Sequence, residues 1–170
     1  MEFTRYFSNQ DREESIYQYF PFDVPRGVNG VTVRMTHDGW SSVVDLGLFD
    51  PDGFRGWSGS ERELIAVSRN GATPGYIPGE IISGTWFVSI GLHQIEKDGI
   101  NVKVIIDFGD PKFPPLATSP ITSSRPPRRE LIAPPGWRWI PADFHSHSIH
   151  SDGSLSLEEL ANLGLEQGLE

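Results

Sequence analysis

Between residues 12 and 109, apolar and polar positions alternate with the period of a β-strand. In the segment GVTVRMTH (residues 30–37), for example, Val31, Val33 and Met35 alternate with polar or charged side chains. A period of two places alternate side chains on opposite faces of a sheet, so this pattern predicts strands that are buried on one face. The segments predicted as strands are 16–24, 30–37, 41–50, 63–68, 84–90 and 100–108.

Turn-forming residues separate these segments at short and fairly regular intervals. Clusters of Gly, Pro, Asn and Asp recur between them, and the clearest is Asp50-Pro51-Asp52-Gly53. Short strands joined by such turns are typical of an antiparallel sandwich or jelly roll. We therefore expect a mainly β protein, in which residues 1–109 form a jelly-roll-like antiparallel β-sandwich, and no helix before residue 155.

The next segment, residues 110–141, is rich in proline. It holds nine of the fourteen prolines in the chain. Because proline lacks a backbone donor and favours extended conformations, we interpret this segment as a linker. Trp137 and Trp139 lie at its end and are expected to anchor it by packing.

The last segment, residues 142–170, changes pattern again. Residues 142–146 are predicted as a short strand, and residues 151–153 as a turn. Ser156 and Glu159 have the spacing of a capping box, and apolar residues then recur at helical spacing up to Gly168, a typical helix stop. A strand, a loop and a helix in this order predict one βα unit.

Composition narrows the classes of function. The formal net charge of -9 argues against a nucleic-acid-binding protein, and the cluster Arg125, Arg128 and Arg129 is best explained as part of a solvated linker. The absence of cysteine excludes disulfides and thiolate chemistry and fits a bacterial protein of either compartment. No segment has the length of a membrane span, and MEFTRYFSNQDREES lacks a signal-peptide core, so a cytoplasmic location is the default expectation.

Histidine and aspartate are concentrated in the stretch DFHSHSIHSDG, residues 143–153, here called the histidine segment. Along a strand His145 and His147 point to the same side, and Asp152 follows in a loop that can fold back toward them. Mixed histidine and carboxylate ligands suit Zn, Mn or Fe. Asp143 is predicted to orient a ligand from outside the coordination shell, and His150 to join the site, contact substrate or lie exposed. The alternative is a polar surface loop without a metal.

The histidine segment and the predicted helix resemble the opening of the PHP (polymerase and histidinol phosphatase) superfamily of metal-dependent phosphoesterases. That opening reads D-L-H-x-H-[ST]-x-x-S-D-G, followed by a helix. Phe144 stands where Leu is usual, and Gly164 where the family often has Ala. The Trp137-Arg138-Trp139 sequence after a β-rich half is similar to the CehA/McbA-like branch. The positions that match the motif are Asp143, His145, His147, Ser151, Asp152 and Gly153.

The resemblance implies a (β/α)7 barrel with two or three metal ions and a phosphate-ester substrate. His145 and His147 would bind the first metal, and Asp152 would complete or bridge the site. The family's later ligands have no counterpart before Glu170. We therefore expect this chain to be the N-terminal portion of such a hydrolase, truncated after the first βα unit and inactive by itself. The remainder of the barrel, or another copy of the chain, would be its partner.

The β-rich part resembles, more weakly, pre-peptidase C-terminal-type accessory domains. Asp45, Asp50 and Asp52 can bind calcium in a turn, although ordinary turn chemistry is the favoured explanation of Asp-Pro-Asp-Gly. Trp40 and Trp57 can stack on a sugar, although packing in the core or at an edge is the favoured explanation, and Trp86 is predicted to lie in the core. A second hypothesis therefore remains: a non-catalytic module that binds carbohydrate or protein, or assembles as a homo-oligomer through its βα tail.

Overall fold

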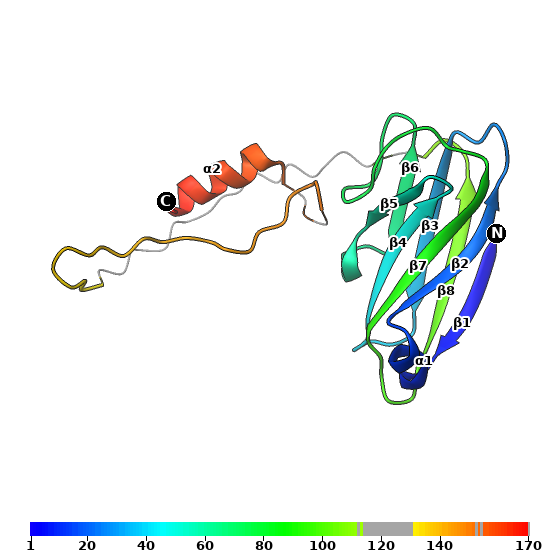
Figure 1. The fold of residues 1–170 in the computed structure, drawn as a ribbon, viewed down its shortest axis with the longest axis horizontal. Helices are drawn as coiled ribbons and strands as arrows, with labels where there is room; N and C mark the ends of the chain where they lie inside the picture. The colour runs from blue at the N-terminus through cyan, green and yellow to red at the C-terminus, as the bar shows by residue number, and fades with distance from the viewer. Residues whose placement is uncertain (112, 114–130, 152, 154, 170) are drawn as a thin grey trace.

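The computed structural model describes residues 1–111, 113, 131–151, 153 and 155–169. Its main body is an antiparallel β-sandwich of eight strands (Figure 1). The strands are β1 (Glu2–Phe7), β2 (Tyr17–Val24), β3 (Gly30–His37), β4 (Val43–Asp50), β5 (Gly53–Trp57), β6 (Leu64–Ser68), β7 (Gly84–Gln94) and β8 (Ile100–Phe108). The prediction of a mainly β sandwich is confirmed, and β8 ends next to the predicted boundary at residue 109.

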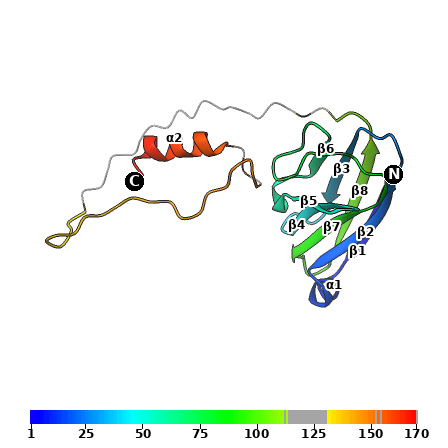
Figure 2. The ribbon, with the colours of Figure 1, turned by 45° about the horizontal axis from the view of Figure 1, so that its top comes forward.

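The strands form two four-stranded sheets. One sheet has the order β1-β8-β3-β6, and the other has the order β2-β7-β4-β5. Figure 2 shows the two layers from a second direction. Among the described strands, only β4 and β5 are consecutive and pair with each other, so every other connection between these strands runs from one sheet to the other. This crossing pattern is consistent with the predicted jelly-roll-like arrangement.

The core lies between the two sheets. In β3 the alternating Val31, Val33 and Met35 are all buried, as the pattern predicts. Trp86 of β7 is fully buried and donates its indole N–H to the carbonyl of Ile82 at 2.8 Å, which confirms its predicted core position. The inward-facing side chains of both sheets therefore make one continuous apolar layer.

Two strands and one α-helix of the sandwich were not predicted. The first is β1, which pairs with β8 at the sheet edge, and the second is β5, a short strand with two glycines. The third is the helix α1 (Asn9–Glu14), which contradicts the prediction of no helix before residue 155. It is polar on all sides and therefore lacks an apolar stripe. It begins at a capping box in which Ser8 and Asp11 bond each other reciprocally, the one local signal for it.

The predicted helix in the C-terminal segment is confirmed as α2 (Leu157–Gln167). Ser156 and Glu159 form its capping box, and Gly168 ends it with φ 75°, a left-handed conformation that glycine adopts without strain. The strand predicted at 142–146 is wrong, because these residues have no strand assignment. A strand forms only when a neighbouring strand satisfies its backbone groups, and no described strand pairs with this segment.

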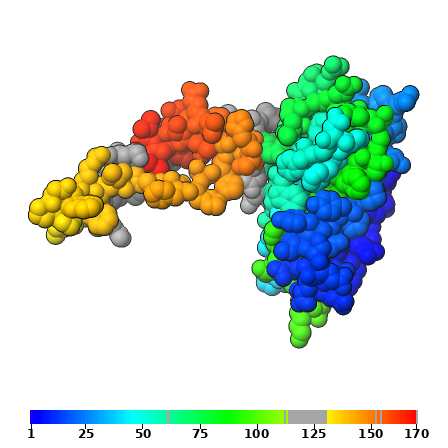
Figure 3. Space-filling view, in the orientation of Figure 1, coloured from blue at the N-terminus to red at the C-terminus, as the bar shows by residue number. Residues whose placement is uncertain are grey.

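The described part of the predicted linker, residues 131–141, contains no helix or strand. Trp137 and Trp139 are exposed rather than packed, so the expected anchoring by these residues is wrong. The segment lies apart from the sandwich, as the space-filling view shows (Figure 3). No helix among the described residues has both the length and the apolar character needed to cross a membrane.

Candidate metal-binding site

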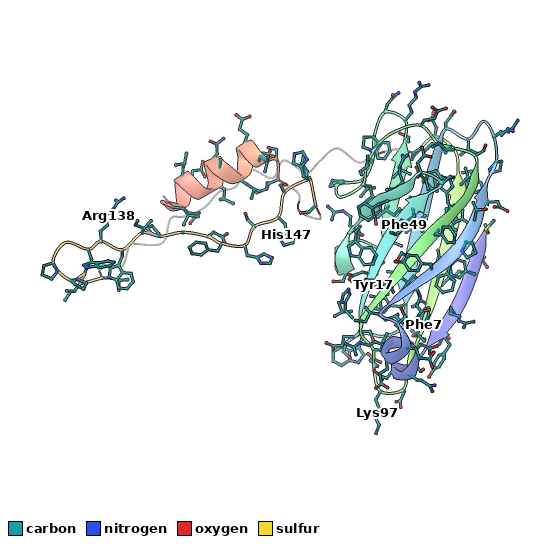
Figure 4. The ribbon with its side chains drawn as sticks, in the orientation of Figure 1. Phe7, Tyr17, Phe49, Lys97, Arg138 and His147 are labelled. Atoms are coloured by element: carbon teal, nitrogen blue, oxygen red, sulfur yellow. The ribbon has the colours of Figure 1, made fainter. Side chains whose placement is uncertain are left out.

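The imidazole rings of His145 and His147 lie together on the histidine segment. Their Nε2 atoms are 2.8 Å apart, and their rings stack with centroids 4.9 Å apart at 26°. Both residues are exposed, and Figure 4 labels His147 between α2 and the sandwich. The two rings share a side although residues 142–146 lack the strand that the prediction assumed. This part of the sequence prediction, two imidazoles on one side, agrees with the geometry.

The two Nε2 atoms suit a shared cation. At 2.8 Å one ring nitrogen carries a hydrogen that the other accepts. Two imidazoles on one tetrahedral zinc, with Zn–N bonds of about 2.0–2.1 Å, hold their nitrogens roughly 3.3 Å apart. The pair would need to separate by only a few tenths of an ångström, and a metal would replace the shared hydrogen.

Two of the other predicted site residues, Asp143 and His150, lie within the described part of the chain. The Asp143 carboxylate accepts the backbone N–H of His145 at 2.9 Å, so it supports the backbone at the first histidine rather than its ring. His150 is exposed, and its backbone N–H donates to Ser148 Oγ at 3.2 Å. Asp152 lies outside the described residues. Within the described part of the chain, no group of three or more candidate ligands comes together.

A tight turn follows the two histidines. The buried Ser148 accepts at its carbonyl from the backbone N–H groups of Ser151, at 2.9 Å, and Gly153, at 3.1 Å. A Cβ atom at residue 153 would collide with the backbone of His147. Only glycine therefore allows the chain to fold back here, which gives a physical reason for the glycine in Ser-Asp-Gly.

This turn rests on the sandwich. The carbonyl of Ile149 accepts from the backbone N–H of Gly75 at 3.3 Å, and the carbonyl of Gly153 accepts from Arg62 Nη2 at 3.3 Å. A Cβ at residue 75 would lie 2.7 Å from the Ser151 carbonyl oxygen, and Gly75 has φ 90°. Glycine is thus required at position 75 for two reasons: its φ is positive, and a larger side chain would collide with the turn that lies against it.

Sequence reasoning missed Arg62 and Gly75 as neighbours of the histidine segment. Arg62 lies 81 residues, and Gly75 68 residues, before the start of this segment. Arg62 follows the short 3₁₀ helix η1 (Gly59–Glu61), and Gly75 lies in the loop after β6. Their proximity depends on tertiary structure, and no local pattern indicates it.

The predicted calcium-binding turn is held by hydrogen bonds and by an ion pair. Asp50 Oδ1 accepts from the backbone N–H groups of Asp52, at 2.8 Å, and Gly53, at 2.9 Å. Asp50 Oδ2 lies 3.0 Å from Arg55 Nη1 in a buried ion pair. Turn geometry and the ion pair therefore account for both oxygens of Asp50 without a cation.

No family model matches this chain, and no curated protein matches it. The fold defines its class only broadly, as a β-sandwich protein with an appended C-terminal helical segment.

Proposed function

We propose that residues 142–169 are the first metal-binding unit of a PHP-type metal-dependent hydrolase that acts on phosphate esters. The observation that carries the proposal is the convergence of the His145 and His147 Nε2 atoms, 2.8 Å apart and directly before a tight Ser-Asp-Gly turn. The capped helix α2 after this turn adds support, since it follows in the order that the motif requires.

In this proposal His145, His147 and Asp152 hold a divalent metal, Zn, Mn or Fe. When bound, such a metal polarises a phosphoryl oxygen and lowers the pKa of a bound water. The chain's own residues position these ligands. The Asp143 carboxylate holds the backbone N–H of His145, and Gly153 closes the turn after His147. The ligands that complete a multinuclear site would come from the remainder of a PHP barrel or from another copy of the chain.

Calorimetric titration with ZnCl2 and with MnCl2 tests the ligand assignment. We expect the chain to bind metal, and the His145→Ala/His147→Ala double variant to bind at least tenfold more weakly, because both imidazole donors are lost. His93→Ala is the matched control, since it removes a histidine on the sandwich. Equal affinity in the chain and the double variant would contradict the proposal.

A hydrolysis assay tests the activity of the chain separately. With p-nitrophenyl phosphate and added Mn²⁺ or Zn²⁺, we expect no turnover above the metal-only background, because the described residues supply too few ligands. Turnover that depends on His145 would show that this chain is catalytic by itself.

One observation favours a second candidate, an assembly module. None of the residues of α2 is buried, and Leu157 and Leu165 on this helix are 63% and 70% exposed. An amphipathic helix without a packing partner needs one to be stable. The rest of a barrel, or a second copy of this chain, would supply it. Light scattering across a range of concentrations discriminates the two: a monomer throughout argues against assembly of copies, and a dimer abolished by Leu157→Glu supports it.

A further inference from the structure

The outer face of the sheet β2-β7-β4-β5 carries an unusual number of aromatic side chains. The inner face of this sheet already supplies the core through Trp86 and its neighbours, so these residues are not needed there. Figure 4 labels two of them, Tyr17 and Phe49, on the sandwich. The aromatic face, as we name it, consists of Tyr17, Tyr19, Phe49, Phe54, Trp57 and Phe87.

Trp57 lies against the sheet over two glycines. A Cβ at Gly91 would come within 2.9 Å of the six-membered ring of the indole, and a Cβ at Gly47 would overlap the opposite edge of the same ring. Both strands therefore carry glycine where the indole rests. The indole covers the backbone at these two glycines, and Trp57 is only partly buried. Tyr17 stands edge-on beside it, with ring centroids 5.5 Å apart at 80°.

A buried carboxylate lies beside this pair of rings. Asp45 is only 7% exposed, although it points to the outer side of the sheet. Its Oδ2 accepts from the indole N–H of Trp57 at 3.0 Å and lies 2.8 Å from His93 Nε2. Among the described residues none donates to Oδ1, and the Asp45 side chain keeps 10% of its surface exposed. The carboxylate thus keeps an open acceptor next to an aromatic surface.

We propose that this site binds a neutral oligosaccharide. A sugar ring offers apolar C–H groups that stack on an aromatic face, and hydroxyl donors that suit the open oxygen of Asp45. An anionic ligand would meet the Asp45 carboxylate on a chain of net charge -9, so electrostatics disfavours it.

The rest of the aromatic face indicates a ligand longer than one sugar unit. Tyr19 and Phe49 have ring centroids 5.7 Å apart, and Phe49 and Phe54 have centroids 5.4 Å apart. These rings continue from Trp57 across β2, β4 and β5. A linear oligosaccharide would therefore cover Trp57 and Tyr17 with one unit and the Tyr19–Phe49 rings with the next.

Calorimetry and ¹H–¹⁵N NMR of the full chain with cellohexaose, xylohexaose and mannohexaose test the proposal. We expect at least one of them to bind, with shifts concentrated on β2, β4 and β5. We also expect Trp57→Ala and Tyr17→Ala to lower the affinity of the chain for that sugar at least tenfold. The affinity of Trp57→Tyr should lie between that of these variants and that of the wild type. Trp40→Ala is the matched control, because Trp40 is 93% exposed on the loop after β3, and it should bind as the wild type does. Circular dichroism confirms that each variant is folded.

Three outcomes would overturn the proposal. The first is no binding of any of the three sugars at millimolar concentration. The second is unchanged binding by both Trp57→Ala and Trp57→Tyr. The third is tighter binding of tetramethylammonium than of the sugars, since that would make the Tyr17–Trp57–Asp45 group a cation site. Metal affinity is expected to be unchanged in Trp57→Ala, which separates this site from the histidine segment.

Discussion

Asp50 and Arg55 form an ion pair that is buried inside the sandwich. The side chains are 4% and 8% exposed, respectively, and Arg55 also donates to the Glu80 carbonyl at 3.1 Å. Its guanidinium lies over Trp86, 5.5 Å from the ring centroid. A buried guanidinium is stable only while its charge is compensated, so this pair joins the β4–β5 turn to the core.

We expect Asp50→Asn to lower the free energy of unfolding by about 3 kcal/mol, because it leaves the Arg55 charge buried without its carboxylate. Asp52→Asn in the same turn is exposed and should change stability by less than about 0.5 kcal/mol. Urea unfolding followed by tryptophan fluorescence measures both.

The same variants test the calcium hypothesis. Adding CaCl2 should leave the Tm of the wild-type chain unchanged, since both Asp50 oxygens already have partners. A calcium-dependent rise in Tm that Asp52→Asn abolishes would favour the calcium site.

At the scale of elements, α2 depends on its cap more than a packed helix does. Glu159 accepts the backbone N–H of Ser156 at 2.7 Å, and Ser156 Oγ accepts that of Glu159 at 3.2 Å. An eleven-residue helix with no buried residue is marginal by itself. We expect Ser156→Ala to cost about 1 kcal/mol of helix stability and to speed amide exchange across Leu157–Gln167. Unchanged exchange there would mean that a partner, rather than the cap, holds the helix.

The cap also makes α2 sensitive to acid. The hydrogen bonds from Ser156 hold the pKa of Glu159 below its ordinary value of 4.5. A carboxylate with a lowered pKa stabilises the folded helix above that ordinary value, and this stabilisation is lost as the pH falls through the lowered pKa. The helical signal of α2 should therefore decrease below about pH 4, and Glu159→Gln, which can still bond but does not titrate, should remove that decrease. Far-UV circular dichroism follows both, and an identical acid response in Glu159→Gln would count against this cause.

At the scale of the whole molecule, the chain has a self-sufficient part and a dependent part. The sandwich closes its core with its own residues, whereas the described tail meets it through the turn at residues 148–153. Removing residues 142–170 should therefore shift the Tm of the sandwich by no more than about 2 °C. Leu46→Ala in the core should cost about 2–5 kcal/mol. Scanning calorimetry measures both, and a large decrease in Tm on removing the tail would show that the two parts fold together.

The sequence determined the strands that alternate clearly, the β4–β5 turn and the helix α2. In each case the signal is local: side-chain period along β3, turn chemistry at Asp50 and Gly53, and capping residues at Ser156 and Gly168. It also predicted that His145 and His147 face the same side, although it did so from a strand that is not assigned at these residues. It could not predict β1, whose strand conformation depends on pairing with β8 at the sheet edge, or the lack of a strand at 142–146, with which no described strand pairs.

Only the tertiary structure decided which distant residues meet. The contact of Arg62 and Gly75 with the histidine segment joins positions far apart in the chain, and no period or motif encodes it. The same holds for Trp57 over Gly47 and Gly91. In the sequence the two glycines only weaken a strand prediction, whereas in the structure they leave room for the indole ring. Local rules act over a few residues, whereas these sites arise from strand order and sheet pairing, which depend on the packing of the whole sandwich.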